Sequence, residues 1–273
     1  MNPAYLIGLA LCVVLCVLGI VFDGVAVSGV AGSLGRFVNL PGLLITVGGT
    51  LAALAAAFPP EQTMRMFKHM PIILGFHRDE PVHYVNTLTD LSAIARRRGL
   101  RGLEEAVRES DDGFLRGGIM LVVDAIEPAK VREQLEKKLD NIEERHAQSW
   151  ELYDRGAALA PGFGMIGTVI GLINMLGSMN FADEGGASRL AAGLALAFVS
   201  TLYGLLLANL AFIPMGTQLR ARHASEMLCK EIIIEGVVSI QAGENPRHIH
   251  EKLMSFLTGR QRVIAEAYTD APE

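Results

Sequence analysis

Long apolar stretches alternate with charged segments along this chain. Four stretches contain no Asp, Glu, Lys or Arg: residues 4–22, 40–58, 156–181 and 190–214. They hold 19, 19, 26 and 25 residues, and a helix of about 20 apolar residues crosses a bilayer core of roughly 30 Å. The pattern predicts an all-α integral membrane protein with four transmembrane helices. The first stretch lacks a basic leader and is longer than a signal-peptide core, so we interpret it as a membrane anchor.

The segments between and after these stretches have the periodicity of helices. In 82–98 the apolar residues recur at helical spacing. Residues 65–76 mix apolar and basic positions, which is typical of a helix lying along a membrane surface. A turn at 243–246 is expected to precede a last helix. The sequence therefore predicts a helical domain outside the membrane.

Two of the membrane helices are expected to extend beyond the bilayer. Residues 128–142 form an apolar seam with charges on the other faces. No stop signal separates this seam from the third apolar stretch, so one helix is expected from about Pro128 to about Leu176, roughly 70 Å long. The fourth stretch is likewise expected to continue as a helix to about Gly236.

Lys and Arg residues predict the orientation in the membrane. Segment 59–155 holds 15 of them and segment 215–273 holds seven, whereas Arg36 and Arg189 are alone in the two other connections. Cytoplasmic loops carry such an excess of positive charge, so both large segments and both termini are expected in the cytoplasm. The expected organisation is transmembrane helices one and two in 1–58 (4–22, 40–58), a cytoplasmic helical domain in 59–155, transmembrane helices three and four in 156–214 (156–181, 190–214), and cytoplasmic C-terminal helices in 215–273.

Composition argues against several classes of function. The chain has 273 residues, 51% of them hydrophobic, and a formal net charge of −5. This charge gives no support to nucleic-acid binding, which needs a basic footprint. Its three cysteines are too few for a disulfide scaffold. The common nucleotide-binding, hydrolase and zinc-protease motifs do not occur, and His248 and His250 are interpreted as a solvated pair beside a turn. We expect no enzyme, no metal site and no cofactor.

Small residues and prolines mark the third and fourth stretches. Gly164, Gly167 and Gly171 recur at spacings of three and four, which gives a bare helix face suited to close helix packing. Pro161 lies inside the third stretch and Pro214 at the matching end of the fourth. Because proline removes a backbone hydrogen bond and bends a helix, the two are interpreted either as simple kinks near the membrane interface or as a paired hinge.

Two hydroxyls lie well inside the same stretches. Thr168 and Thr201 either bond back to their own helix turns or, where both face one pore, offer oxygen ligands to a hard cation. Asn209 is a further polar group that could bond between helices. None of the four stretches contains an Asp, Glu, Lys, Arg or His, so this chain alone offers no titrating site for a proton relay. If the chain conducts ions, a partner must supply the carboxylate.

Several motifs together give the whole chain a resemblance to the MotA family of flagellar stator subunits, which includes the sodium-driven PomA proteins. The third-span motif is shared with TolQ and ExbB proteins, but its combination with four spans and a charged patch points to MotA. The matching segments are 40–50 (second span), 95–100 with 103–104 (charged patch), 161–172 (third span), 197–204 with Pro214 (fourth span) and 243–246 (start of the C-terminal helix).

The resemblance implies a function and a set of partners. In the family, five copies surround a dimer of MotB or PomB in the inner membrane, in contact with lipid. The membrane carboxylate of that dimer passes protons or sodium ions, and the pentamer turns against the rotor protein FliG. By matching position, the resemblance implies that Arg96, Arg97, Arg98 and Glu104 contact the rotor, that Pro161 and Pro214 are the functional prolines, and that Thr168 and Thr201 lie near the ion site.

Geometry limits what the arginine run can do. Successive residues on a helix are about 100° apart, so only one or two of Arg96, Arg97 and Arg98 are expected to face solvent. The alternative interpretation of this run is a solvated helix end, where basic residues favour the helix dipole.

The coupling ion and the function each have alternatives. The paired threonines favour sodium, although hydroxyls also occur in proton-driven relatives. An ExbB- or TolQ-like energy transducer is disfavoured because those relatives have three spans. A non-conducting membrane scaffold is the alternative from another class, in which the glycines only pack and the helical domain binds partners.

Overall fold

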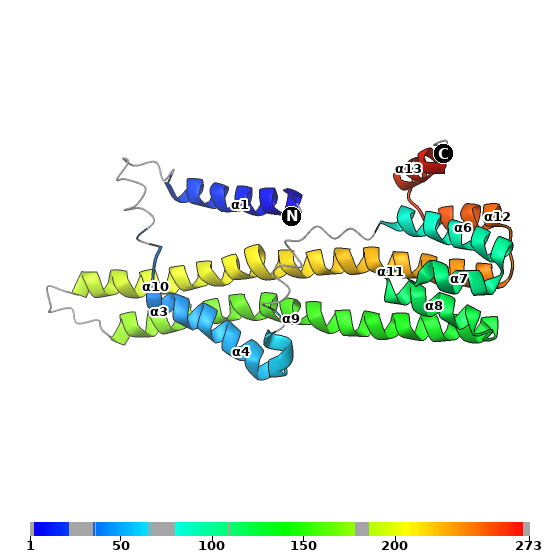
Figure 1. Ribbon diagram of the computed structural model, residues 1–273. Coiled ribbons are helices and arrows are strands. Elements are labelled where there is room, and N and C mark those ends of the chain that lie inside the picture. Colours follow the sequence, from blue (N-terminus) through cyan, green and yellow to red (C-terminus); the bar gives the residue numbers. More distant parts are fainter. Residues whose placement is uncertain are drawn as a thin grey trace. The chain divides into compact units, whose positions relative to one another are not determined.

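The computed structural model describes residues 3–21, 35, 37–64, 66, 80–108, 110–177 and 186–269. All regular elements in this part of the chain are helices (Figure 1), which confirms the predicted all-α class. The helices form two compact units. We call them the apolar unit, Met1–Phe76 with Ala147–Arg220, and the charged unit, His77–His146 with Ala221–Glu273.

The apolar unit contains the predicted membrane spans. Its helices are α1 (Pro3–Val21), α3 (Leu40–Leu43), the π-helical segment η1 (Leu44–Gly48), α4 (Gly49–Ala57), part of α9 (Pro128–Gly177), α10 (Gly186–Leu206), the π-helical segment η2 (Leu207–Phe212) and the start of α11 (Ile213–Gln241). By length and composition, three helical stretches of the described residues are suited to crossing a membrane: Leu40–Ala57, Pro128–Gly177 and Leu190–Gln241. In α1, the described apolar stretch is the shorter Ala10–Gly19, so the first of the four predicted spans stays a prediction.

The two long helices predicted from the sequence are present. Helix α9 runs for 50 residues without interruption and continues through Pro161, because no capping signal divides its charged and apolar halves. Helices α10, η2 and α11 follow one another directly and end at Gln241, beyond the end expected near Gly236. The outer ends of the third and first apolar stretches, 178–181 and 22, lie outside the described residues, as do the outer connections except for 35, 37–39 and 186–189.

A small core holds the apolar unit together. Leu54, Tyr153, Ala160, Ala208 and Phe212 are buried against one another. Tyr153 buries its apolar ring, but its hydroxyl still needs a hydrogen-bond partner. The hydroxyl donates to the carbonyl of Met66 at 3.2 Å. Second-span, third-span and fourth-span segments are therefore packed side by side in this unit.

Local signals set the ends of the second span. The Asn39 side chain caps α3 by accepting from the amide of Gly42 at 2.9 Å, and Pro41 stands in the first turn, where no amide donor is needed. At the other end Phe58 is extended and two prolines follow it. The sequence thus fixes both ends of this helix.

The charged unit has a larger apolar core. Its helices are α6 (Pro81–Arg98), α7 (Leu100–Val107), α8 (Gly113–Val123), α12 (Pro246–Met254) and α13 (Gly259–Thr269), with the remaining parts of α9 and α11. The core confirms the predicted helical seams, since these residues are buried: Val85, Leu88, Leu91, Val131, Leu135, Ile249 and Leu253. The surface helix expected at 65–76 lies outside the described residues apart from residue 66.

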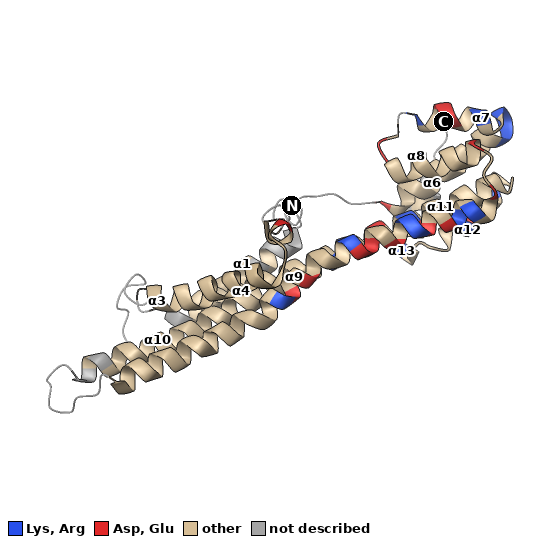
Figure 2. Ribbon diagram, turned by 90° about the horizontal axis from the view of Figure 1, so that it is seen from below, with Lys and Arg blue, Asp and Glu red and all other residues tan. Residues whose placement is uncertain are grey.

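Charged residues lie mainly in the charged unit. Figure 2 shows Lys, Arg, Asp and Glu on the helices of the charged unit and tan ribbon along α3, α4 and α10. Asp112 is the N-cap of α8 and accepts from the amide of Phe114 at 2.7 Å, so some of these charges also shape the helices.

Candidate functional site

Helices α9 and α10 approach each other at the glycines singled out in the sequence. A Cβ added at Gly171 would lie 2.8 Å from the backbone nitrogen of Ala197, and one at Gly164 would lie 3.1 Å from the carbonyl oxygen of Ser200. At Gly167 it would lie 2.5 Å from the Ser200 side chain. Glycines that admit a neighbouring backbone this closely let helices pack tightly in a membrane. The three glycines therefore place the third and fourth spans in direct contact.

The structure brings Thr168 and Thr201 together. Their Oγ1 atoms are in direct hydrogen-bond contact, one from α9 and one from α10. The Thr168 hydroxyl also lies 3.1 Å from the carbonyls of Gly164 and Ala197, and the Thr201 hydroxyl lies 3.2 Å from the same Ala197 carbonyl. Each threonine thus bonds back to its own helix or its neighbour and also faces the other threonine. Four oxygen atoms gather at this point of an otherwise apolar contact.

A second group of hydroxyls lies nearby on the second and fourth spans. Thr46 and Ser200 are fully buried, and the Thr46 hydroxyl donates to the Ser200 carbonyl at 3.2 Å. Ser200 donates to the carbonyl of Leu196 at 2.7 Å. Sequence reasoning missed this group, although Ser200 is next to Thr201 and Thr46 lies in the motif of the second span. Its effect is to fix the second span against the fourth beside the threonine pair.

The two prolines have different surroundings. Pro161 lies inside α9, which is helical on both sides of it. Pro214 is the second residue of α11, which directly follows η2. Proline has no amide to donate to the carbonyl four residues earlier, which is that of Leu210, so the α-helical hydrogen-bond ladder is interrupted within η2. A hinge at these positions stays a prediction.

Asn209 and Tyr203 are the remaining polar groups of the fourth span. The Asn209 side chain donates to the carbonyl of Leu205 within its own helix at 2.8 Å and does not bridge two helices among the described residues. The Tyr203 hydroxyl accepts from the amide of Asn39 at 3.0 Å. Tyr203 therefore ties the start of the second span to the fourth.

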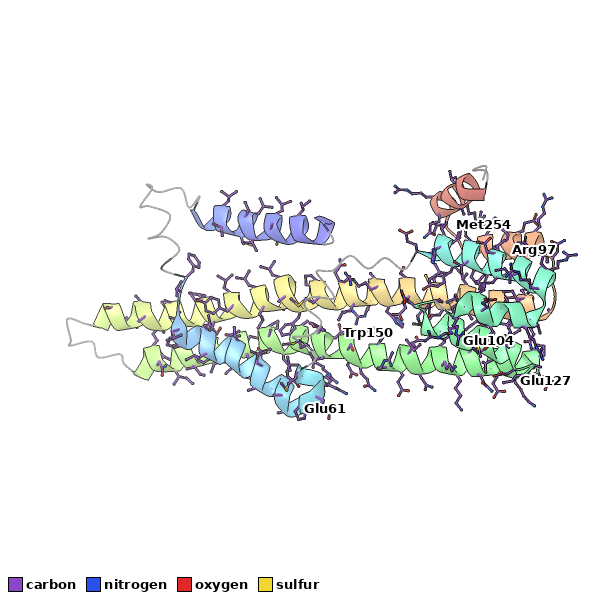
Figure 3. The ribbon with its side chains drawn as sticks, viewed as in Figure 1. Glu61, Arg97, Glu104, Glu127, Trp150 and Met254 are labelled. Atoms are coloured by element: carbon purple, nitrogen blue, oxygen red, sulfur yellow. The ribbon has the colours of Figure 1, made fainter. Side chains whose placement is uncertain are left out.

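The charged patch occupies the corner between α6 and α7. Gly99 joins the two helices with φ of 72°, a conformation that favours glycine. Arg97 and Glu104 are labelled at this corner in Figure 3. Neither these two nor Arg96 and Arg98 form an ion pair with another described residue; Arg97 Nε donates to the Ala93 carbonyl at 3.3 Å. The four charges are therefore available to a partner.

One expectation about this patch is wrong. We expected only one or two of the three arginines to face solvent, but Arg96, Arg97 and Arg98 are all exposed. The reason is that they form the last turn of α6, where the chain turns away at Gly99 and the core residues of α6 end with Leu91 and Ser92. Arg101 and Glu105 on α7 are also exposed and extend the patch beyond the residues singled out in the sequence.

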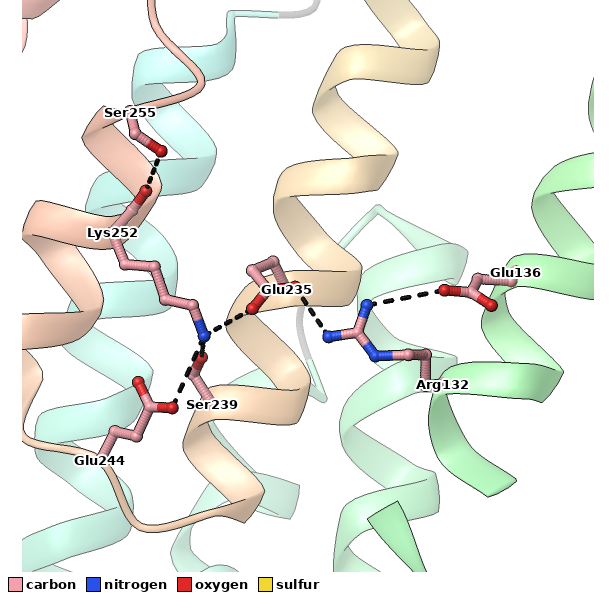
Figure 4. Close-up of polar contacts among 7 residues, drawn as sticks. All are labelled: Arg132, Glu136, Glu235, Ser239, Glu244, Lys252 and Ser255. Atoms are coloured by element: carbon pink, nitrogen blue, oxygen red, sulfur yellow. Dashed lines mark hydrogen bonds and ion pairs between the residues drawn. The ribbon is translucent and has the colours of Figure 1, made fainter. Parts of the chain in front are cut away.

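An ion-pair network joins α9, α11 and α12 in the charged unit (Figure 4). The Glu235 carboxylate, 18% exposed, accepts from Arg132 at 2.7 Å and pairs with Lys252 at 2.5 Å. Burial acts to raise the pKa of Glu235, but the hydrogen bonds from Lys252 and Arg132 outweigh it and hold the pKa below its ordinary value. The same carboxylate raises the pKa of Lys252. Because each of these charges is paired with an opposite charge, we interpret the network as one that stabilises the packing of α9, α11 and α12.

A histidine pair lies between α9 and α11 in the same unit. The Nδ1 atoms of His146 and His223 are 3.2 Å apart, and His146 lies 3.7 Å from the carboxylate of Glu226. Burial lowers the pKa of His146, and the neighbouring Glu226 opposes this effect only in part. No group of three or more His, Cys, Asp or Glu among the described residues is arranged to hold a metal ion.

Comparison with known proteins places these features in a family context. A profile of the MotA/TolQ/ExbB proton channel family matches residues 106–231. Motility protein A of Treponema phagedenis is 41% identical over 86% of this chain and 89% of its own length. Chemotaxis protein PomA of Vibrio alginolyticus is 34% identical over 85% and 89%, respectively. A chain in the structure of the flagellar MotAB stator complex from Bacillus subtilis aligns with a TM-score of 0.82 at 28% identity, covering 95% of this chain and 97% of that chain.

Proposed function

We infer that this chain is the MotA-type subunit of a flagellar motor stator, because it belongs to the motility protein A group of the MotA/TolQ/ExbB proton channel family. The observation that carries this conclusion is the 41% identity to a motility protein A over 86% of the chain. The likeness to a chain of a MotAB stator complex covers both the apolar and the charged unit.

The second type of subunit follows from what this chain lacks. Its apolar stretches hold no carboxylate, and a relative of known structure was solved as a MotAB complex. A MotB- or PomB-type dimer therefore supplies the membrane carboxylate that binds and releases the ion. A hydroxyl oxygen keeps lone pairs for a cation while donating its own proton, so Thr168 and Thr201 are suited to hold an ion next to that carboxylate.

The proposed coupling ion is sodium. Two hydroxyls and two carbonyl oxygens at one place, Thr168, Thr201, Gly164 and Ala197, form the kind of oxygen cluster that a hard cation prefers. A proton needs no such cluster, because it moves between titrating groups. Proton coupling remains the alternative, in which the same hydroxyls serve only to pack the helices.

The charged patch is the proposed point of force transfer to the rotor protein FliG. Arg96, Arg97, Arg98 and Glu104 are exposed and unpaired among the described residues. Exposed charges give fast, reversible and salt-sensitive contacts, as a rotating interface requires. A contact of this kind transmits force without tight binding.

The proposed assembly is a homopentamer around the partner dimer in the bacterial inner membrane. The chain is expected to cross the membrane four times, with both termini and the segments 59–155 and 215–273 in the cytoplasm. These two segments hold 22 of its 24 Lys and Arg residues. Exposed apolar side chains on the spans, such as Val169, Ile173 and Phe198, would then contact lipid, the partner or a second copy. Pro161 and Pro214 would act together as hinges in the two helices that line the ion path.

The experiment that tests this function is rotation of tethered cells that carry the chain with its cognate partner. Rotation is measured under a proton gradient without sodium, then with sodium restored, and with the partner carboxylate changed to the amide. Rotation that needs both sodium and the carboxylate supports the sodium-driven stator, and rotation without sodium makes the stator proton-driven. If the complex assembles but the cells rotate under neither ion, the stator function is wrong, and an envelope energy transducer or a membrane scaffold becomes the proposed function.

A further inference from the structure

A pocket in the charged unit is lined by residues that belong neither to the threonine pair nor to the charged patch. It lies between α6, α12 and α13 and has a volume of about 670 Å³. Small-molecule pockets commonly have volumes of roughly 300–1,000 Å³, so this one has room for much more than a single inorganic ion. Two arginines, Arg247 and Arg262, line it together with His250 and only one carboxylate, that of Glu251. The lining is therefore positively charged.

Arg262 is held in place before any ligand arrives. Its Nε donates to the carbonyl of Leu257 at 3.0 Å, and one terminal nitrogen donates to the carbonyl of Ser255 at 3.2 Å. A guanidinium has five N–H donors, so the others have no partner among the described residues. A cation fixed by backbone carbonyls loses little conformational freedom on binding. The remaining N–H donors of Arg262 are therefore already oriented to bind an anion.

Arg247 has unused binding capacity, whereas His250 only forms part of the wall. The Arg247 side chain is 90% exposed, and its one described partner is Glu251, at 3.5 Å on the same helix, a pair that contributes little in water. His250 Nε2 is buried and has no hydrogen-bond partner among the described residues. Solvent does not reach this nitrogen, so His250 forms part of the pocket wall and is not counted as a hydrogen-bond partner of the ligand.

The remaining walls favour a ligand with an apolar part. Met254 is 9% exposed and lines the pocket, where Figure 3 labels it. Its thioether packs well against flat rings. Thr89 and Ser255 already donate their hydroxyl protons to the carbonyls of Val85 and Lys252, so toward a ligand they act as acceptors.

We propose that this pocket binds a phosphorylated small molecule of mononucleotide size, with its phosphate on Arg247 and Arg262. Planar guanidinium groups match phosphate oxygens with two parallel hydrogen bonds. Helix α6 lines the pocket at Thr89 and ends in the arginines of the charged patch. A bound ligand would therefore tie α12 and α13 to the helix that carries the patch; this regulatory consequence rests on the proposed stator function, whereas binding itself does not.

The test is binding of AMP and ATP to the purified complex of this chain with its partner, measured by equilibrium dialysis. We expect saturable binding of at least one of the two nucleotides, competition by inorganic phosphate, and no binding of adenosine. Arg247→Gln and Arg262→Gln should each weaken nucleotide binding about tenfold or more, because each removes charged hydrogen bonds. Arg260→Gln is the matched control, since Arg260 is an exposed arginine of α13 that does not line the pocket, and it should bind as the unaltered chain does.

Several results would overturn the proposal. These are binding of neither nucleotide, equal binding of adenosine, equal weakening by Arg260→Gln, or capture of a polyglutamate peptide without nucleotide binding. If Arg262→Gln fails to assemble because Arg262 anchors the turn before α13, Arg247→Gln decides the question through its exposed side chain. Because the assay measures no rotation, its failure would leave the stator function intact, and a loss of rotation would say nothing about the pocket.

Discussion

Replacing Thr201 by valine separates an ion ligand from a packing residue. Valine has nearly the shape of threonine but no hydroxyl. In the structure the change removes the contact with Thr168 and the 3.2 Å bond to the carbonyl of Ala197. Thr168 keeps two carbonyl partners at 3.1 Å, those of Gly164 and Ala197. No buried donor is left without an acceptor.

The structure therefore sets a small cost for folding and a larger one for ion binding. A hydrogen bond lost without leaving a buried group unsatisfied costs about 1 kcal/mol, so assembly should be nearly normal. If the Thr201 oxygen contacts the ion, its loss removes a charge-assisted interaction of about 1.5–3 kcal/mol. That energy corresponds to roughly a 10- to 100-fold weaker affinity for sodium.

The assay is rotation speed as a function of sodium concentration. For Thr201→Val we expect the half-maximal speed to need about tenfold more sodium or more, with unchanged amounts of complex in the membrane. Thr201→Ser keeps the hydroxyl and should restore the original curve. Thr217→Val is the matched control, because Thr217 is exposed and bonds only within its own helix, to Ile213 at 2.9 Å.

An unchanged sodium curve for Thr201→Val would refute the ligand role and return both threonines to helix packing. Equal effects of Thr201→Val and Thr217→Val would refute it too, because the effect would then belong to helix stability. A shift found for Thr201→Val and not for Thr201→Ser can arise only from the hydroxyl.

Three further predictions concern packing, the rotor patch and pH. Gly171→Val should prevent assembly, because the new side chain would meet backbone atoms of α10 and destabilise the packed helices by about 3 kcal/mol. Gly162→Ala has open space and should assemble normally. The amount of complex in the membrane reports both outcomes. Arg96→Glu or Glu104→Lys alone should reduce torque in tethered cells while membrane levels stay normal, and normal torque in both would remove these residues from the rotor contact. The pKa of His146 lies below its ordinary value of 6.5, so near pH 6 the unfolded state binds more protons than the folded state, and the charged unit should lose stability as the pH falls through about 6.5. Amide exchange around His146, faster at pH 5.5 than at 7.5 after correction for intrinsic rates, checks this, and His146→Gln should remove the step.

Long-range order of the helices was predictable because it depends on simple periodicity. The seam at Val131 and Leu135 and the absence of a stop signal predicted α9, and both residues are fully buried in it. The turn at 243–246 was predictable from its glycine, asparagine and proline, and Gly243 has φ of 71° there. These features are properties of neighbouring residues, so the sequence expresses them directly.

Contacts between helices were predictable only in part. The glycine spacing indicated a close helix face but not its partner, which the structure gives as α10. Thr46 and Ser200 were missed because a single hydroxyl in an apolar stretch carries no periodic signal, and only the packing of the second span against the fourth reveals their bond. The exposure of all three arginines was missed because helical spacing does not show where the neighbouring core ends.

The π-helical segment η2 makes the fourth span unusually tolerant of one kind of mutation. A π turn amounts to one residue more than an α-helix needs at that point. Deleting a single residue between Leu207 and Phe212 would therefore turn η2 into ordinary α-helix and leave every later side chain of α11 facing as before. The same deletion a few turns further on, near Arg222, would rotate the following faces by about 100° and pull Ile232, Ile233 and Val237 out of the core they occupy. Natural variation in chain length within this helix should accordingly be concentrated at η2.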